Sequence, residues 1–304
     1  MPRLDQIQLR DPFVLPDGDG YCLFGSTDPD VWQGPGVGFD AYRSSAPGAL
    51  TDFDGPVPAF RPPAGFWSER NFWAPEVHRR ADGCFMFATF LPTAGRRGTA
   101  VLRADQPLGP YRPWSDGPVT PPDWECLDGT LHVDADGPWL VFCHEWRQVG
   151  DGQICALRLT DDLSAAAGPP ELLFTASAAP WAQPLPDRPP GSYVTDGPYL
   201  WRPEPGPAGN GPAPLFMLWS SFGADAQYCL GAATSDTGAV HGPWRQAPEP
   251  LYAGDGGHGM VFAGPGGQPY LALHTPNRTP DERAVFIGLT LGPDGLAATG
   301  PVIR

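Results

Sequence analysis

One short phrase recurs five times along this chain, and this recurrence constrains the fold more than any other feature of the sequence. A polar Asp/Gly turn and then an apolar-aromatic run follow each copy; the first such run is Tyr21 to Gly25. The copies start about 60 residues apart, so five units account for nearly all of the 304 residues. The copies are Asp11-Pro-Phe-Val, Ala74-Pro-Glu-Val, Asp128-Gly-Thr-Leu, Asp196-Gly-Pro-Tyr and His258-Gly-Met-Val.

A fixed period with one hairpin per unit predicts a radial repeat fold. A blade of four antiparallel strands fits the unit length, so we expect an all-β, five-bladed β-propeller that forms a single domain over 1–304. In a propeller the equivalent ends of the inner strands meet at one axis, so three aspartates and one histidine should share a pocket. The pattern does not indicate how the ring closes. The expected blades are 8–65, 66–123, 124–190, 191–253 and 254–304.

Composition agrees with a turn-rich β protein. Clusters drawn from 39 glycines and 41 prolines separate short apolar runs, and long helical periodicity is missing. The net charge of −15, with only 19 basic residues, argues against binding to nucleic acid or to an anionic membrane. A neutral substrate is compatible with this charge.

The chain shows no cationic-apolar leader and no run of 18 apolar residues, so export and membrane insertion are not expected. The cysteines form no CxxC pair, which predicts free core thiols in a reducing compartment. We therefore expect a cytoplasmic protein that is a monomer or a weak homo-oligomer. The six cysteines are Cys22, Cys84, Cys126, Cys143, Cys155 and Cys229.

The aspartates at equivalent repeat positions, Asp11, Asp128 and Asp196, would raise one another's pKa, so their clustering points to a function. The chain lacks a Gly-rich phosphate loop, a Gly-x-Ser-x-Gly elbow and a His-Glu-x-x-His motif. These absences argue against phosphoryl transfer, serine-type acyl transfer and zinc hydrolysis. Two carboxyl groups across a scissile bond, one protonated and one ionised, are the arrangement of glycoside hydrolysis. A third carboxylate would raise the pKa of the acid.

The repeat blocks resemble glycoside hydrolase family 43 along essentially the whole chain and in the family's order. The resemblance implies that Asp11 is the general base that activates water and that Asp128 tunes the pKa and orientation of the acid. It also implies that Asp196 is the general acid and that the anomeric configuration is inverted. The blocks are Arg10-Asp-Pro-Phe, Phe72-Trp-Ala-Pro-Glu-Val, Leu127-Asp-Gly-Thr, Thr195-Asp-Gly-Pro and Gly256-Gly-His-Gly.

The acid position departs from that family, which usually has Glu there. Asp196 is one methylene shorter, whereas general acid catalysis requires hydrogen-bond reach to the leaving oxygen. Either the backbone or the substrate lies closer here, or another acid acts. Glu145, in Cys143-His-Glu-Trp, is the substitute candidate, and a weak or inactive enzyme is the third reading.

Four further residues are candidates for substrate contact. Sugar rings stack on indole faces, so Trp73 and Trp146 are expected to wall the pocket, although core packing is an alternative for each. Arg10 is expected beside the axial carboxylates or in solvent. His258 maps to the family histidine that is often near a central calcium or sodium ion; a pocket histidine without an ion is the alternative.

The sequence therefore favours an exo-acting, inverting glycosidase that releases a terminal pentose, α-L-arabinofuranose or β-D-xylose, from oligosaccharides. An axial Ca²⁺ or Na⁺ is the one inorganic partner that the resemblance implies, and no organic cofactor is expected. The alternatives are a catalytically weak or inactive carbohydrate-binding propeller, a glycosidase of galactosides or fructosides, and a glycoside phosphorylase. Phosphorolysis would need phosphate donors around the axis, and only Arg10 and His258 are evident.

Overall fold

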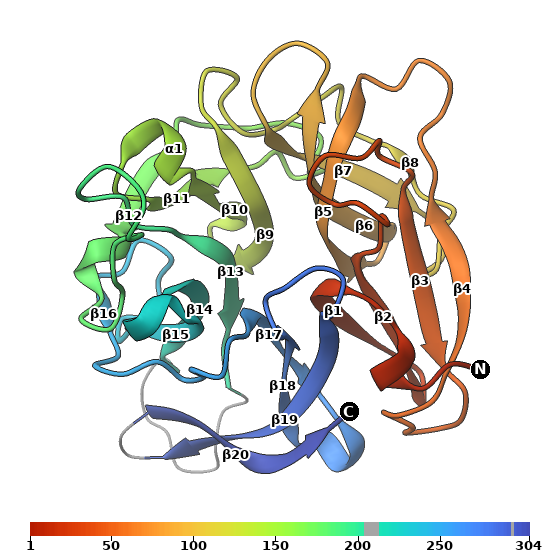
Figure 1. Cartoon of the computed structure of the whole chain (residues 1–304). Coiled ribbons are helices and arrows are strands. Elements are labelled where there is room, and N and C mark those ends of the chain that lie inside the picture. Colours follow the sequence, from red (N-terminus) through yellow and green to blue (C-terminus); the bar gives the residue numbers. More distant parts are fainter. Residues whose placement is uncertain (204–212, 293–294) are drawn as a thin grey trace.

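The chain forms five four-stranded antiparallel sheets, each built from one continuous segment and arranged around a common centre (Figure 1). The computed structural model describes residues 1–203, 213–292 and 295–304. Strand order within each sheet follows chain order, so every blade is an up-and-down meander. The predicted five-bladed propeller is confirmed.

The blades agree with the predicted units. Blade 1 contains β1 (Arg10–Asp17), β2 (Gly20–Ser26), β3 (Phe39–Ser44) and β4 (Phe53–Phe60). Blade 2 contains β5 (Ser68–Arg80), β6 (Gly83–Pro92), β7 (Gly98–Ala104) and β8 (Arg112–Pro113). Blade 3 contains β9 (Cys126–Asp134), β10 (Gly137–His144), β11 (Gln153–Arg158) and β12 (Glu171–Thr175). Blade 4 contains β13 (Asp196–Trp201), β14 (Leu215–Phe222), β15 (Tyr228–Ser235) and β16 (Trp244–Gln246). Blade 5 contains β17 (Gly257–Ala263), β18 (Pro269–Thr275), β19 (Arg283–Gly292) and β20 (Gly295–Ile303).

Helical segments are short throughout the described residues. They are the α-helix α1 (Trp146–Val149) and the 3₁₀ turns η1 (Leu4–Gln6), η2 (Ala176–Ala178), η3 (Ala224–Ala226) and η4 (Pro265–Gly267). None of these segments could cross a bilayer as an apolar helix.

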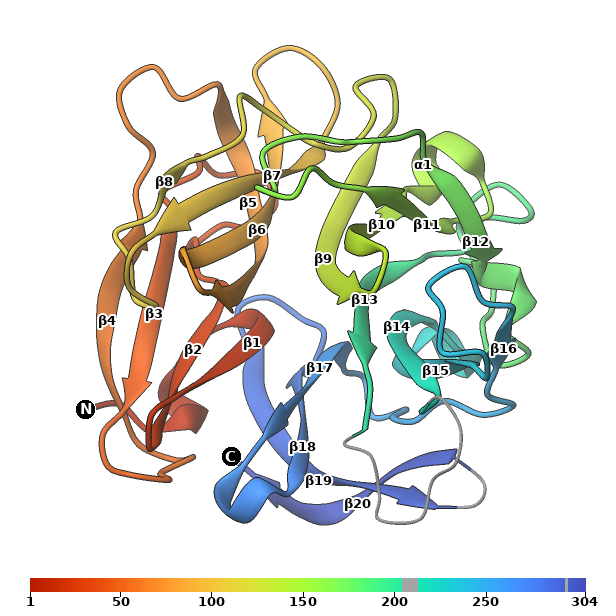
Figure 2. The same cartoon turned by 180° about the vertical axis from the view of Figure 1, so that it is seen from behind.

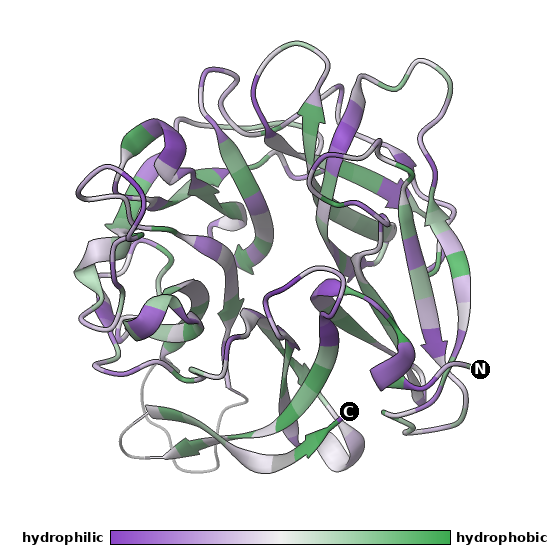
Figure 3. Cartoon of the chain, viewed as in Figure 1, coloured by the Kyte–Doolittle hydropathy of each residue, from purple (hydrophilic) through white to green (hydrophobic). Residues whose placement is uncertain are grey.

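Side chains of neighbouring blades form the core. Every residue of β2 is buried, because this strand has a blade face on each side. Between blades 2 and 3, Phe85 and Phe87 pack with Leu140 and Phe142 in one buried cluster. Apolar residues concentrate on the strands, while polar residues are frequent in the loops (Figure 3). Burial of one such side chain stabilises the fold by about 1.5–3 kcal/mol, so the interfaces between blades hold the ring together.

The inner strand of every blade is bulged at the same place, and a residue with left-handed backbone occupies the bulge. These residues have φ values of 47° to 55° and lie two positions before the point where regular pairing resumes. They are Asp11, Ala74, Asp128, Gly197 and His258.

In blade 4 the left-handed residue lies one position after the residue that the sequence repeat predicted. The sequence phrase places Asp196 at the equivalent position, but Gly197 occupies it and Asp196 precedes it, paired with Ser220. Glycine is required there, since a Cβ on Gly197 would lie 2.6 Å from Cγ of His258. The sequence repeat was aligned on the residue type Asp. The structural repeat is instead defined by the left-handed backbone, which in blade 4 belongs to Gly197.

A second regularity links each blade to the next. In four blades a residue at or near the end of the second strand accepts a hydrogen bond from the amide of the next blade's left-handed residue. Ser26 Oγ accepts from Ala74 N, Thr89 Oγ1 from Asp128 N, and Ser220 Oγ from His258 N, each at 2.8 Å. Nδ1 of His274 accepts from Asp11 N at 3.1 Å, which completes the link from blade 5 to blade 1. Blade 3 has Cys143 at this position, and Oδ2 of Asp128 accepts from Gly197 N instead, at 3.2 Å.

The ring closes by contact between blade 5 and the start of blade 1, where β17 lies beside β1 (Figures 1 and 2). The guanidinium of Arg10 donates to Oε1 of Glu282 at 2.7 Å and to Oδ1 of Asn277 at 2.8 Å. The amide of Leu9 donates to the carbonyl of Glu282 at 3.4 Å. In the described part of the chain no strand is exchanged between these two blades, so side chains and one isolated bridge, Gln8 to Arg283, make the closure.

Candidate active site

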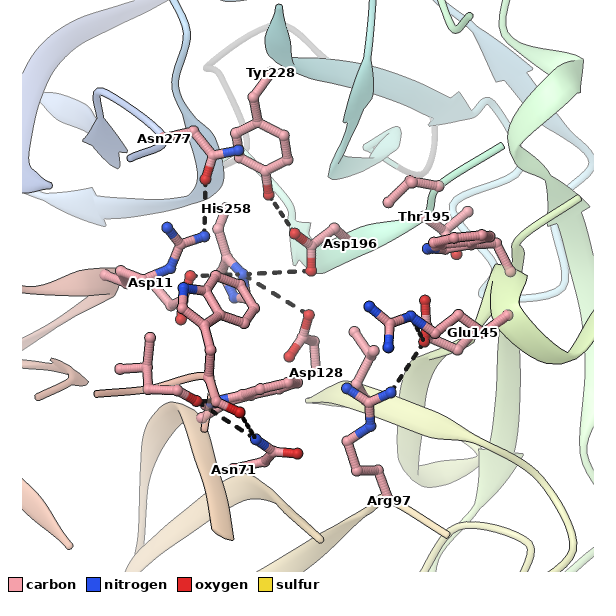
Figure 4. Close-up of a pocket in the computed structure, with 18 of the residues that line it drawn as sticks. Asp11, Asn71, Arg97, Asp128, Glu145, Thr195, Asp196, Tyr228, His258 and Asn277 are labelled. Carbon is pink, nitrogen blue, oxygen red and sulfur yellow. Dashed lines mark hydrogen bonds and ion pairs between the residues drawn. The ribbon is translucent and has the colours of Figure 1, made fainter. Parts of the chain in front are cut away.

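A cavity of about 690 Å³ opens at one end of the propeller axis, and all five blades contribute to its lining. Its floor consists of Asp11 on β1, Asp128 on β9, Asp196 on β13 and His258 on β17 (Figure 4). The bulges turn these inner strands at their axial ends, which directs the four side chains toward one another. The structure thus brings together all four residues that the repeat predicted for the axis.

Nδ1 of His258 lies at the centre of the three carboxylates. It is 3.2 Å from Oδ1 of Asp11, 3.9 Å from Oδ2 of Asp128 and 3.9 Å from Oδ1 of Asp196. Asp11 and Asp128 are buried, whereas the Asp196 side chain is 25% exposed. Asp196 is therefore the carboxylate that faces the open cavity.

Asp11 is surrounded by groups that favour its ionised form. Ser26 Oγ donates to Oδ2 of Asp11 at 2.7 Å. Burial alone would raise the pKa of Asp11, but His258 and Arg10 outweigh it, and the net pKa lies below the usual value. Burial and Arg10 lower the pKa of His274 to about 4, so this ring is neutral at pH 7 and its Nδ1 accepts the Asp11 amide.

Asp128 and Asp196 form a close carboxylate pair. Their ligand oxygens and a His258 nitrogen all lie within 4.8 Å of one another. Burial, and next the charge of Asp196, raise the pKa of Asp128 well above its usual range. The Tyr228 hydroxyl donates a hydrogen bond to Oδ2 of Asp196. The pair can hold a proton at a pH where Asp11 is ionised, which gives the site one acid and one base.

Glu145 lines the same cavity but lies beside Arg97 rather than among the aspartates (Figure 4). Its Oε2 is 3.1 Å from Arg97 and 3.6 Å from Arg147. Burial raises the pKa of Glu145, and this effect outweighs the opposite effect of the two guanidinium groups. Glu145 is therefore set apart from the axial aspartates by its position beside the arginines.

Arg10, Trp73 and Trp146 also line the cavity. Arg10 is buried against Glu282 and stacks over Trp32 at 4.9 Å, so its charge is already paired. Trp73 donates its indole N–H to the carbonyl of Val31 and meets Trp32 edge to face at 5.5 Å. Trp146 is the first residue of α1 and lines the cavity.

Several lining residues escaped the sequence analysis because they lie outside the repeat phrase. Trp32 is in the loop between β2 and β3 and is 47% exposed, although it forms a wall of the cavity. Asn277 and Arg188 also lie in loops, and Tyr228 begins the third strand of blade 4. The β2–β3 loop is the longest such loop among the blades and carries a Trp, which is a signal that could have drawn attention to it.

The family resemblance implies an axial cation, and three side chains at the axis could bind one. Asp128, Asp196 and His258 offer three ligand atoms in one cluster. Calcium takes six to eight oxygen ligands, so this set fits a cation that keeps most of its ligands as water. Such an ion would offset the mutual repulsion of the carboxylates.

A propeller whose axis brings together one carboxyl group of lowered pKa and one of raised pKa has the arrangement of a glycosidase. The family model for glycosyl hydrolases family 43 matches residues 5–291. The chain therefore belongs to glycoside hydrolase family 43 and is an O-glycosyl hydrolase.

Solved structures agree with this assignment. The chain is 36% identical to an endo-arabinase from Bacteroides thetaiotaomicron VPI-5482, with a TM-score of 0.86 over 96% of this chain and 98% of that one. It shares its fold with an α-L-arabinofuranosidase from Lactobacillus brevis, at 19% identity and a TM-score of 0.74, over 97% and 95% of the two chains. No curated protein matches the sequence.

Proposed function

We propose that this protein is an exo-acting, inverting hydrolase that releases a terminal pentose, α-L-arabinofuranose or β-D-xylose, from oligosaccharides. The observation that supports it most is the convergence of three carboxylates on one histidine nitrogen at the floor of a single cavity. The six buried free thiols of the protein suit a reducing compartment. We therefore propose that the protein is cytoplasmic and acts on imported oligosaccharides.

In this mechanism Asp11 is the general base. Its lowered pKa keeps it ionised at neutral pH, so it can take a proton from a water molecule as that water attacks the anomeric carbon. Asp196 is the general acid, which gives its proton to the glycosidic oxygen as the bond from the anomeric carbon to this oxygen breaks. Asp128 shares this proton with Asp196. Because the pKa of Asp128 is raised, the pair retains the proton until Asp196 transfers it to the leaving oxygen.

The shape of the cavity supports exo action. Loops and strand ends of all five blades surround the floor, and Trp32, Trp73 and Trp146 stand around it. A terminal sugar can enter such a pocket from one side. The 36% identity to an endo-arabinase favours a second candidate, internal cleavage of an arabinan chain.

The first products of hydrolysis distinguish exo cleavage from endo cleavage. Exo action on linear arabinan or xylo-oligosaccharides yields monosaccharide from the first minutes, whereas endo action yields short oligosaccharides before any pentose. Proton NMR of the first product reports its anomeric configuration, and a product of retained configuration contradicts the inverting mechanism. Sugar binding without turnover of nitrophenyl arabinofuranoside, xyloside or galactoside would instead indicate a binding propeller.

The acid is identified by its dependence on the leaving group. Replacement of Asp196 by Ala should lower kcat on natural linkages by about 100-fold or more, because these need protonation of the leaving oxygen. Nitrophenolate leaving groups need little protonation, so turnover of nitrophenyl pentosides should be far less affected. Glu145→Ala is the matched control, and the same selectivity in that variant rather than in Asp196→Ala would move the acid role to Glu145.

We propose in addition that a Ca²⁺ or Na⁺ ion is held on the axis by His258 and the neighbouring carboxylates, largely through water. Dialysis against a chelator should then lower Tm and activity, and added Ca²⁺ should restore both. Unchanged Tm and activity after chelation and after exchange of Na⁺ for a bulkier cation would contradict this ion.

A further inference from the structure

Guanidinium groups gather on one wall of the active-site cavity, although the chain as a whole carries a net charge of −15. This wall contains three arginines: Arg97 in the loop between β6 and β7, Arg147 in α1, and Arg188 in the loop before β13. The floor bears the opposite charge, that of the three aspartates. The cavity is therefore divided between an acidic floor and a basic wall.

Two of these arginines lie over the aromatic ring of Trp146. The guanidinium carbon of Arg147 is 5.6 Å from the centre of the Trp146 ring, and that of Arg188 is 5.8 Å from it. An indole face accepts the C–H face of a sugar ring, and guanidinium groups beside it donate hydrogen bonds in a fixed planar fork. The three residues thus combine a stacking surface with donors for an anion.

Not every guanidinium on this wall is held in an ion pair. Glu145 accepts a hydrogen bond from Arg97 and forms an ion pair with Arg147, and Glu125 also pairs with Arg97. Arg188 is exposed and has no carboxylate within ion-pair distance among the described residues. Asp187 lies in the same loop and is the nearest carboxylate in sequence, but no ion pair joins the two. At least one guanidinium therefore remains free to bind a ligand anion.

This wall lies on the side of the leaving group. The acid protonates the glycosidic oxygen, so the rest of the substrate extends from that oxygen beyond the acid and away from the base. Asp196 and the preceding Thr195 lie between the base Asp11 and Glu145 in the cavity (Figure 4). Trp146 follows Glu145 directly, and the loop that carries Arg188 leads into Asp196. An anionic group of the substrate would thus meet the arginines well away from the acidic floor.

We propose that Trp146, Arg147 and Arg188 form a subsite for an acidic sugar, a uronic acid unit with a free carboxylate, in the leaving-group part of the substrate. The inference rests on the proposed glycosidase function and names its preferred substrate class: oligosaccharides that carry both pentose and uronate units. The indole stacks on the sugar ring, and the guanidinium groups bind its carboxylate.

The test compares two forms of one substrate, glucuronoarabinoxylan oligosaccharides and the same oligosaccharides after reduction of the carboxyl group to an alcohol. The wild-type protein should cleave the acidic form with a kcat/KM about tenfold higher, because one charge-assisted hydrogen bond is lost on reduction. The ratio should fall toward 1 in the double variant Arg147→Gln/Arg188→Gln and in 1 M NaCl. Arg112→Gln, an exposed arginine on β8 outside the cavity, should keep the wild-type ratio.

Binding separates failure of this subsite from failure of the hydrolase proposal. In the Asp11→Asn background, calorimetry should give tighter binding of the acidic form, and Arg147→Gln/Arg188→Gln should remove the difference. That result supports the subsite even if no variant turns over substrate. Equal kcat/KM for the two forms, equal affinity for them, or binding of neither would overturn the acidic subsite, while pentose release from neutral substrates would leave the hydrolase function intact.

Discussion

Three of the five left-handed positions of the inner strands carry side chains of the axial cluster. Asp11, Asp128 and His258 have φ values of 54°, 55° and 50°. Asp, Asn and His tolerate this region better than other residues that carry a Cβ, because their short polar side chains bond locally. The same bulge that bends the strand at the axis therefore suits an acidic or imidazole side chain, so local backbone preference and chemistry coincide at these residues.

The two buried aspartates should respond to neutralisation with opposite changes in stability. Because the pKa of Asp11 is lowered in the fold, its charge stabilises the protein above the pKa of the unfolded chain, and this stability is lost as pH falls through the folded value. Asp11→Asn should therefore lower Tm at pH 7. The pKa of Asp128 is raised, so its ionisation opposes folding increasingly as pH rises above about 4. Asp128→Asn should raise Tm at pH 7.

Thermal unfolding of both variants between pH 4 and pH 8 measures these effects. The gain in Tm for Asp128→Asn should be largest near pH 8 and shrink toward pH 4. Both variants should lose turnover by at least about 100-fold, since one removes the base and the other the partner of the acid. A higher Tm for Asp11→Asn at pH 7, or activity near that of the wild type, contradicts the assignment.

At the scale of the strand, a residue near the end of the second strand supports the first strand of the next blade in four of the five blades. Ser26, Thr89, Ser220 and His274 each accept one amide hydrogen bond from a left-handed residue. This amide cannot pair within its own sheet because the bulge displaces it. The support residue is therefore as important to the axial geometry as the axial residue itself.

Ser220→Ala tests this support. It leaves the buried amide of His258 without its acceptor, which should cost about 1–3 kcal/mol and displace His258, so kcat should also fall. Ser44→Ala is the matched control, because Ser44 Oγ also accepts a buried backbone amide at 2.8 Å, that of Tyr21, but far from the axis. Urea unfolding should show similar losses in the two variants, and only Ser220→Ala should lose activity. Equal activity losses would show that stability alone, rather than the position of His258, governs turnover.

For the whole molecule, the closure between blades 5 and 1 depends on a buried ion pair. Arg10 and Glu282 are 2.7 Å apart, with side-chain exposures of 8% and 0%. Glu282→Ala would leave the guanidinium of Arg10 buried without its carboxylate, which should lower the free energy of unfolding by about 3–5 kcal/mol. The neighbouring pair of Arg278 and Asp281 is exposed, so Asp281→Ala should change it by only about 0–1 kcal/mol. Chemical denaturation compares the two, and equal small effects would show that closure depends on other contacts.

The sequence predicted the blades and the axial residues because both follow from a repeat whose period the core enforces. It misplaced the fourth copy by one residue, since residue type at Asp196-Gly197 hid the backbone conformation that defines the repeat. Trp32, Asn277 and Arg188 were missed because loops carry no periodic pattern, and their position follows only from the packing of distant blades. Closure through Arg10 and Glu282 joins residues 272 apart and left no local signal.

The link from blade 3 to blade 4 has a practical consequence for protein engineers. Elsewhere around the ring a dedicated side chain joins adjacent blades, but here Asp128 itself accepts the amide of Gly197. Replacing, swapping or recombining blades at this seam would disturb the reactive carboxylate together with the architecture. New chain termini or inserted modules should be better tolerated at the other seams, where the linking amide is accepted by a residue other than the three aspartates.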